Sequence, residues 1–141
     1  MSSPVLVDTS AWVEYLRATG SAQDIALGRA LQSPDGVLMP AVVLQELLQG
    51  ARSPQHFIAL QSALETVDLF EPQDWGHLHA QAGLLYARCR WQGLTLRNPI
   101  DCVVAACALE AELPLLARDA DFVHLQRVAP DLQTTLHRVW L

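Results

Sequence analysis

Short apolar stretches that alternate with helical stretches are the feature of this sequence that most constrains its fold. Residues 4–9, 37–40, 67–70 and 114–118 each have the pattern of a short buried strand, and 134–141 is expected to be a last strand. The residues between them have apolar positions at helical spacing. Parallel strands need such helical crossovers, and a sheet covered on both faces needs continuous apolar strands. The sequence therefore predicts an α/β fold, a three-layer α/β/α sandwich with a central, mainly parallel sheet of about five strands.

Helix start signals support this alternation. Serine, asparagine and proline at the first positions of a helix satisfy or remove the backbone N–H groups that lack partners there. Four helices are placed in this way: 10–17 capped by Ser10, 54–65 after Ser53, a long helix from Pro72 to residue 92, and 99–112 after Asn98. Helical spacing alone predicts three more, at 21–33, 41–51 and 119–129.

Length and composition favour one cytoplasmic domain. A chain of 141 residues with 51% hydrophobic content suffices for one full-sized core, so we expect a single domain over residues 1–141. The longest apolar run, 102–109, is far shorter than the roughly 20 residues that cross a bilayer, and no targeting segment is expected. The three cysteines form no C-x-x-C pair, so neither a disulfide framework nor a zinc knuckle is indicated.

The charged residues exclude some functions and leave one question open. All nine basic residues are arginine, so mechanisms that need a lysine amine are excluded, including Walker-type phosphate loops and Schiff-base enzymes. A net charge of −6 ordinarily argues against a nucleic-acid partner. That argument depends on where the acidic residues lie.

Several acidic residues occur where ligands bind in open parallel sheets, beyond the carboxyl ends of the strands. Asp8 ends the first strand, Asp119 ends the fourth, and Asp121 follows two residues later. Asp101 lies in the first turn of a helix, and Glu46 interrupts the apolar segment AVVLQELL. A buried charge needs a partner, so Glu46 is expected to meet an arginine or a metal.

Each acidic residue also has a simpler interpretation. Asp119 could cap the next helix, and Asp101 and Asp121 could only interact with a helix dipole. Asp8 could be a turn residue, and Glu46 a surface glutamate on a helix. The joint pattern is less ordinary, because acids from distant segments would converge at one sheet edge if the strand assignments hold.

Four motifs, in order, resemble the PIN-domain ribonucleases, particularly the VapC toxins of bacterial toxin-antitoxin pairs. They are VLVDTSAWVEYLR, VVLQELLQG, NPIDCVVAACALE and LLARDADF, and the resemblance covers essentially the whole chain. It implies a metal-dependent endoribonuclease that cleaves single-stranded RNA. The sequence departs from the family pattern at Ala117, where related sequences often carry a hydroxyl residue. That departure concerns the orientation of Asp119.

The resemblance also implies the site. An acidic quartet, Asp8, Glu46, Asp101 and Asp119, would hold Mg²⁺ or Mn²⁺, with Ser10 as an orienting hydroxyl and Asp121 as an accessory acid. Carboxylate oxygens are the ligands that these cations prefer. We expect Asp8 and Asp101 to be the main metal ligands. Without these five acids, ten of the fifteen remain against nine arginines, so the acidity is concentrated in the predicted site.

Partners are expected on the same basis. The resemblance implies an RNA substrate, a homodimer and a VapB-like antitoxin that contacts a surface including Trp12 and Leu16 and delivers an arginine to the acids. Four arginines near the motifs could pair with phosphates or be ordinary surface residues: Arg17, Arg52, Arg97 and Arg118. Trp12 and Trp91 could stack on bases, although core or interface packing is the better interpretation.

Three other functions remain open from the residues alone. A phospho-receiver domain also gathers acids at strand ends, but the missing lysine argues against it. A haloacid-dehalogenase-like phosphatase would need an aspartate two residues after Asp8, where Ser10 lies. The third alternative is a catalytically silent PIN-like module that binds RNA or protein.

Overall fold

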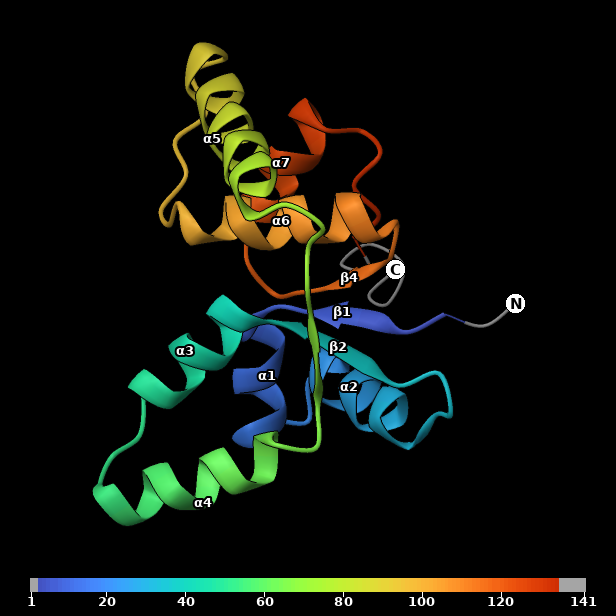
Figure 1. Ribbon diagram of the computed structural model, residues 1–141, viewed down its shortest axis with the longest axis vertical. Coiled ribbons are helices and arrows are strands. Elements are labelled where there is room, and N and C mark those ends of the chain that lie inside the picture. Colours follow the sequence, from blue (N-terminus) through green and yellow to red (C-terminus); the bar gives the residue numbers. More distant parts are fainter. Residues whose placement is uncertain (1–2, 135–141) are drawn as a thin grey trace.

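The computed structural model describes residues 3–134, and the helices and strands in this range alternate as the sequence predicts (Figure 1). In chain order the elements are β1 (Val5–Val7), α1 (Thr9–Leu16), α2 (Ala22–Gln32), β2 (Val37–Pro40), α3 (Ala41–Gln49), α4 (Pro54–Leu64), β3 (Asp68–Phe70), α5 (Trp75–Trp91), α6 (Ile100–Ala111), β4 (Leu115–Leu116) and α7 (Asp121–Val128).

The strands form one parallel sheet in the order β3-β2-β1-β4. Leu6 of β1 is in register with Leu38 on one side and with Leu115 on the other. Within residues 3–134 the sheet has four strands, not five. The predicted last strand lies, except for Thr134, outside the described residues. Thr134 makes an isolated parallel bridge with Leu115.

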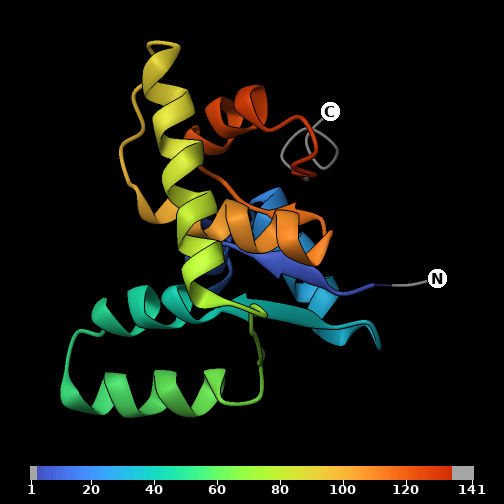
Figure 2. The same ribbon diagram turned by 45° about the horizontal axis from the view of Figure 1, so that its top comes forward.

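Helices cover both faces of this sheet, which confirms the three-layer fold. Helices α5, α6 and α7 lie on one face, and α1 to α4 lie on the other (Figure 1). The pair α3 and α4 extends away from the sheet as a helical hairpin (Figure 2). No helix within the described range is long and apolar enough to cross a membrane.

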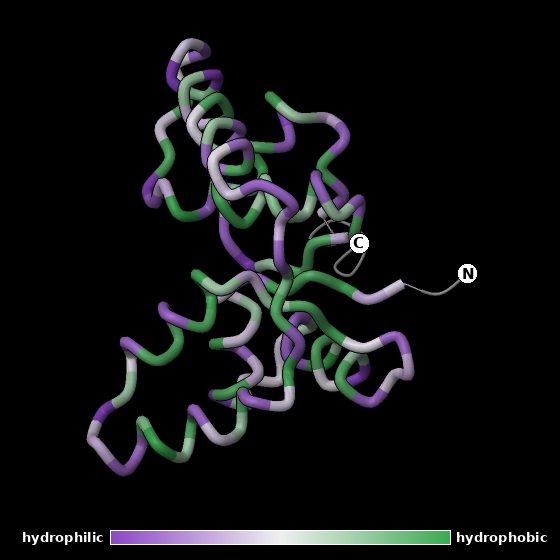
Figure 3. Tube along the Cα trace, viewed as in Figure 1, coloured by the Kyte–Doolittle hydropathy of each residue, from purple (hydrophilic) through white to green (hydrophobic). Residues whose placement is uncertain are grey.

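The core lies where the central strands meet α6. Leu6 and Val7 of β1 are fully buried, as are Val104 and Ala105 of α6. Hydrophobic residues gather along the strands, and polar residues concentrate toward the outer turns (Figure 3). Helix α6 is apolar around most of its circumference, as a helix packed between a sheet and other helices must be.

Two predicted helix starts are wrong by a few residues. Asp8, not Ser10, is the N-cap of α1, because the helix begins directly after the strand and the Asp8 carboxylate accepts the Ser10 backbone N–H at 3.0 Å. Helix α5 begins at Trp75, not at Pro72, because Asp74 caps it through the His77 backbone N–H at 2.9 Å. Ser53 caps α4 as predicted.

The strand order creates a switch point between β1 and β4. From β1 the chain proceeds outward to β2 and β3, and it then returns to place β4 on the other side of β1. The helices that follow these two strands therefore diverge to opposite faces, which opens a crevice beyond the strand ends. Asp8 follows β1 directly, and Asp119 follows β4.

Candidate active site

Asp8 is held in one orientation at the end of β1. Its side chain is 2% exposed, and its Oδ2 accepts hydrogen bonds from the Ser10 backbone N–H at 3.0 Å and from Ser10 Oγ at 2.5 Å. Ser10 Oγ also accepts the Arg118 backbone N–H at 2.8 Å, which joins the start of α1 to the segment after β4. Asp8 Oδ1 is buried and has no hydrogen-bond partner within the described range. One carboxylate oxygen is thus left for a ligand.

Glu46 lies half-buried in α3, and neutral groups hold both of its carboxylate oxygens. Thr9 Oγ1 donates to Oε1 at 2.7 Å, and Asn98 Nδ2 donates to Oε2 at 3.3 Å. These donors come from α1 and from the connection between α5 and α6. In the described structure the partners of Glu46 are therefore a hydroxyl and an amide, so of the two expected partners, an arginine or a metal, the arginine is not present.

Asp101 lies in the first turn of α6 and is 4% exposed. Its Oδ2 is buried without a partner among the described residues. The pKa of Asp101 is raised to about 9, mainly by burial, and the charge of Asp8, a hydrogen bond with Asp121 and the charges of Asp119 and Asp121 contribute to this value. A carboxyl with such a pKa is protonated at neutral pH unless a cation is present.

The pKa of Asp8 is also raised, to about 6. Burial is the main cause, and the charges of Glu46 and Asp119 add to it, while the two hydrogen bonds from Ser10 act in the opposite direction. Asp8 and Asp101 thus each interact electrostatically with carboxylates from distant segments of the chain. The structure brings the acids of β1, α3, α6 and the β4–α7 connection together at one sheet edge.

Asp119 and Asp121 organise the loop that precedes α6. Asp121 is 2% exposed, and its Oδ2 accepts the backbone N–H groups of Arg97 at 2.9 Å and Asn98 at 3.1 Å. Asp119 Oδ1 accepts the Asp121 backbone N–H at 2.9 Å and pairs with Arg97 Nη2 at 3.1 Å. The bond from the Asp121 N–H lies at the start of α7, whose N-cap is Ala120 without a side-chain capping bond, so the simpler interpretation of Asp119 as the cap of this helix is wrong. The charge of Asp119 acts on both Asp8 and Asp101.

The donor set fits a hard divalent cation. Asp101, Asp119 and Asp121 each offer a carboxylate oxygen, and these oxygens lie within 4.8 Å of one another. Asp8 is not part of this triplet, but its charge acts on Asp101. The unpaired buried oxygens of Asp8 and Asp101 lack a positive partner, and oxygen-only ligands suit Mg²⁺ or Mn²⁺.

The predicted arginines differ in their surroundings. Arg97 pairs with Asp119, and its Nε lies 4.0 Å from Asp121 Oδ1. Arg118 Nη1 lies 3.4 Å from Glu14 Oε1 and donates to Gln23 Oε1 at 3.1 Å. Arg17 and Arg52 are exposed.

The two tryptophans lie in opposite environments. Trp12 is 2% exposed and packs edge-on against Tyr15, with ring centroids 6.0 Å apart. The interpretation of Trp12 as a core residue is thus right, and its placement on a partner surface is wrong. Leu16 is 44% exposed and remains available to a partner, and Trp91 is 70% exposed.

Sequence reasoning missed two residues of the site. It gives Thr9 no role and treats Asn98 only as a helix cap, yet both donate to Glu46. The signal lay in the motifs themselves, since Thr9 is the middle residue of the D-T-S triplet and Asn98 opens N-P-I-D. Both are polar residues beside a predicted acid.

Comparison with known proteins identifies the family. The model of the PIN domain matches residues 5–128. Over 125 residues the chain is 34% identical to VapC ribonuclease Mb1587 of Mycobacterium bovis. The aligned segment covers 88% of this chain and 92% of that protein. The same identity and coverage hold for ribonuclease VapC11 of Mycobacterium tuberculosis.

Solved structures agree at the level of the fold. VapBC-1 of nontypeable Haemophilus influenzae superposes with a TM-score of 0.69 at 23% identity, covering 92% of this chain and 95% of the other. VapBC2 of Rickettsia felis, bound to a DNA fragment from its promoter, superposes with a TM-score of 0.67 at 18% identity. The match covers 92% of this chain and 96% of the other. With the sequence match over most of its length, the chain belongs to the PIN-domain family and, within it, to the VapC ribonucleases.

Proposed function

We propose that this protein is a Mg²⁺- or Mn²⁺-dependent endoribonuclease that cleaves single-stranded RNA. The observation that carries this proposal is the pair of buried, unpaired carboxylate oxygens of Asp8 and Asp101 at the switch point of the sheet. Two uncompensated buried carboxylates are costly for a fold, and a cation removes that cost. Single-stranded RNA is favoured because its backbone and bases are accessible.

In this proposal Asp8 and Asp101 are the main metal ligands. Glu46 and Asp119 complete the site directly or through water, and Asp121 supports it as an accessory acid. A divalent cation held by these residues would lower the pKa of a water and offset charge at the scissile phosphate and the leaving oxygen. In hydrolysis the water oxygen bonds to phosphorus as the bond from phosphorus to the leaving ribose oxygen breaks; the water loses one proton and the ribose oxygen gains one.

The chain's own residues position this chemistry. Ser10 fixes Asp8 through its two hydrogen bonds, and Thr9 and Asn98 fix Glu46. Arg97 is 74% exposed along its side chain, so its guanidinium can turn from Asp119 to a phosphate of the RNA. An arginine fork suits phosphate oxygens because it can donate two parallel hydrogen bonds.

We also propose that the protein is the toxin of a toxin-antitoxin pair in the cytoplasm. Its structural neighbours include VapBC complexes, and its curated relatives are VapC ribonucleases. The expected partner is a VapB-like antitoxin that delivers an arginine to the acids, and the expected assembly is a homodimer. Because Trp12 is buried, the antitoxin surface on the early helices would use exposed residues such as Leu16 and Ile25.

A cleavage assay tests the enzymatic proposal. Purified protein with Mg²⁺ or Mn²⁺ is expected to cut a labelled single-stranded RNA, and excess chelator is expected to stop it. Undiminished cleavage in chelator would contradict the metal mechanism. RNA binding without cleavage under any divalent metal would favour the catalytically silent PIN-like module instead.

Expression in cells tests the proposal of a toxin. Production of the protein alone is expected to arrest growth, and co-expression of an antitoxin encoded by the adjacent reading frame is expected to restore growth. The matched control is Asp101→Asn, which is expected to retain the fold but to lose one expected metal ligand. Normal growth with the unmodified protein produced at a high level would contradict toxicity.

A further inference from the structure

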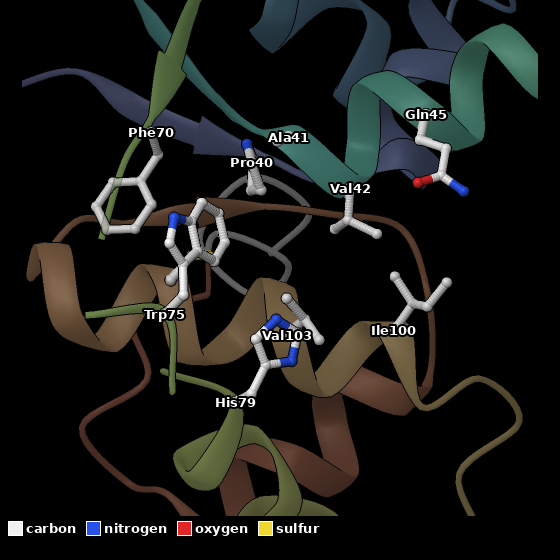
Figure 4. Close-up of a pocket in the computed structure, with 10 residues that line it drawn as sticks. Pro40, Ala41, Val42, Gln45, Phe70, Trp75, His79, Ile100 and Val103 are labelled. Carbon is white, nitrogen blue, oxygen red and sulfur yellow. The ribbon is translucent and has the colours of Figure 1, made fainter. Parts of the chain in front are cut away.

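A cavity of about 360 Å³ lies between β2, β3 and the helices α3, α5 and α6 (Figure 4). Pro40 and Phe70 pair in register across β2 and β3, so the two strand ends form one wall. Among the described residues, none of those that line the cavity is Asp, Glu or Arg. A cavity of this size and lining suits a small, flat, largely apolar group with polar edges.

Aromatic rings line one side of this cavity. Trp75 and His79 are one turn apart on α5, with ring centroids 6.2 Å apart and planes inclined by 33°. Phe70 lies near Trp75 on the same side (Figure 4). Trp75 is 47% exposed, so a large aromatic surface faces solvent at the cavity. Such a surface can stack on a planar ligand.

The opposite side of the cavity borders the carboxylate site. Val42 lies one turn before Glu46 on α3, and Ile100 directly precedes Asp101 on α6. The hydrogen bond from Asn98 to Glu46, at 3.3 Å, joins the two segments along this border. A group that fills the cavity therefore lies next to the segments that carry Glu46 and Asp101.

We propose that this cavity binds one nucleobase of the RNA next to the cleaved phosphodiester bond, with Trp75 and His79 stacking on it. This inference rests on the proposed function of the carboxylates. The base is the uncharged, planar part of a nucleotide and matches the cavity, whereas the phosphate matches the cation site and the arginines. Base–aromatic stacking tolerates any sequence, because every base has a π-face.

Gln45 provides the edge contact in this proposal. It lines the cavity on α3, and its Nε2 donates to Gln49 Oε1 at 2.8 Å. That bond uses one of the two amide hydrogens, so the other hydrogen and Oε1 can bond to the edge of a base. Stacking thus supplies affinity, and Gln45 supplies a preference between bases.

Abasic scanning of a cleaved RNA tests the stacking. Abasic residues are introduced one at a time, and kcat/KM is measured for wild type, Trp75→Ala and the control Trp91→Ala, an exposed tryptophan at the far end of α5. At one position next to the cut, loss of the base is expected to lower kcat/KM by about 5- to 100-fold in wild type and in Trp91→Ala. In Trp75→Ala the same abasic residue is expected to have little further effect.

The same scan includes the outcome that overturns the inference. If the abasic residue lowers kcat/KM equally in Trp75→Ala and Trp91→Ala, Trp75 does not stack on the base. Gln45→Ala is expected to change the base preference at that one position, while the control Gln61→Ala, an exposed glutamine on α4, leaves it unchanged. An unaltered preference in Gln45→Ala would remove Gln45 from the proposal.

A binding measurement separates this inference from the proposed function. The four ribonucleosides carry no phosphate, so they probe the cavity without needing the carboxylate site. At least one is expected to shift the NMR signal of the Trp75 indole N–H, assigned by its loss in Trp75→Phe, and to leave that of Trp91 unchanged. If RNA is not cleaved but Trp75 responds, only the proposed function fails. If no nucleoside shifts the Trp75 signal, the nucleobase site fails.

Light scattering tests the main competing occupant, a second copy of the chain. Trp75→Ala is expected to keep the oligomeric state of wild type. Conversion of a wild-type dimer to a monomer by Trp75→Ala would show that a partner subunit covers the cavity, and it would overturn the nucleobase site.

Discussion

Asp101 combines deep burial, an unpaired oxygen and a pKa raised to about 9 by burial and its acidic neighbours. Replacing it with asparagine removes the ionisable group with little change of shape. The metal-free Asp101→Asn protein is therefore expected to unfold at a urea concentration equal to or above that of wild type, and cleavage is expected to fall below detection.

The matched control for this prediction is Glu110→Gln, an exposed acid on the same helix. It is expected to leave both urea stability and cleavage unchanged. Strong destabilisation of metal-free Asp101→Asn would show that Asp101 acts as a structural residue at the helix start, and its assignment to the metal would then be wrong.

The same carboxylates predict how stability depends on pH. The pKa values of Asp8 and Asp101 rise from 3.8 to about 6 and about 9, so the folded state binds these protons more tightly than the unfolded state. Their contribution is most favourable below the unfolded pKa and is lost as pH rises through the folded pKa. Metal-free protein is thus expected to lose stability between about pH 4 and pH 9.

Urea unfolding in chelator over this pH range measures the effect. For Asp8 alone, the change from 3.8 to about 6 corresponds to roughly 3 kcal/mol, because one pKa unit is 1.36 kcal/mol. In Asp101→Asn the decline above about pH 6 is expected to flatten. A wild-type stability that increases from pH 6 to pH 9 would contradict the convergence of the acids.

At the scale of elements, Ser10 connects α1 to the segment that follows β4. It donates to Asp8 and accepts the Arg118 backbone N–H at 2.8 Å. Ser10→Ala removes both bonds, so we expect a loss of about 1–2 kcal/mol in the free energy of unfolding. Misplacement of Asp8 is expected to lower kcat by about 10- to 100-fold.

Ser53→Ala is the matched control for this change. Ser53 caps α4 by accepting the His56 backbone N–H at 3.0 Å, on the hairpin away from the acids. Its loss is expected to cost about 1 kcal/mol of stability without changing kcat. If Ser10→Ala and Ser53→Ala lower stability alike and neither changes kcat, Ser10 is a structural residue only.

For the molecule as a whole, metal binding is expected to couple to folding. A cation that binds only the folded state at a hundredfold excess over its Kd adds about 2.7 kcal/mol, which corresponds to a rise in Tm of roughly 10 °C for a chain of this size. Thermal melts with and without Mg²⁺ measure this rise. Asp101→Asn is expected to respond much less, and equal responses would argue against the proposed ligand set.

Much of this fold can be predicted from local patterns. The strands at 37–40 and 67–70 and the cap at Ser53 are present within a residue or so of the expected positions. The periodicity of apolar positions, short apolar runs and capping residues each involve only a few neighbouring positions. They can therefore be recognised without knowing the rest of the structure. The fifth strand and the single domain stay predictions, because the described residues do not test them.

The candidate site, too, can be predicted only in part from local sequence patterns. That Asp8 and Asp119 follow parallel strands can be predicted from the sequence, although β4 ends at Leu116, and the rule for open sheets then places both residues at one edge. Only the tertiary structure shows that Thr9 and Asn98 hold Glu46. Those contacts join residues 37 and 52 positions apart, and no local pattern encodes which side chains meet over such separations.

Burial and charge coupling belong to the tertiary structure for the same reason. Trp12 has the local pattern of a surface anchor as readily as that of a core residue, and only packing places it at 2% exposure. The pKa of Asp101 depends on Asp8, Asp119 and Asp121 meeting it in a space that excludes water. The sequence by itself determined which residues are acidic and where the strands end. Folding alone decided how close the charges lie and how little solvent separates them, and those two quantities set their energies.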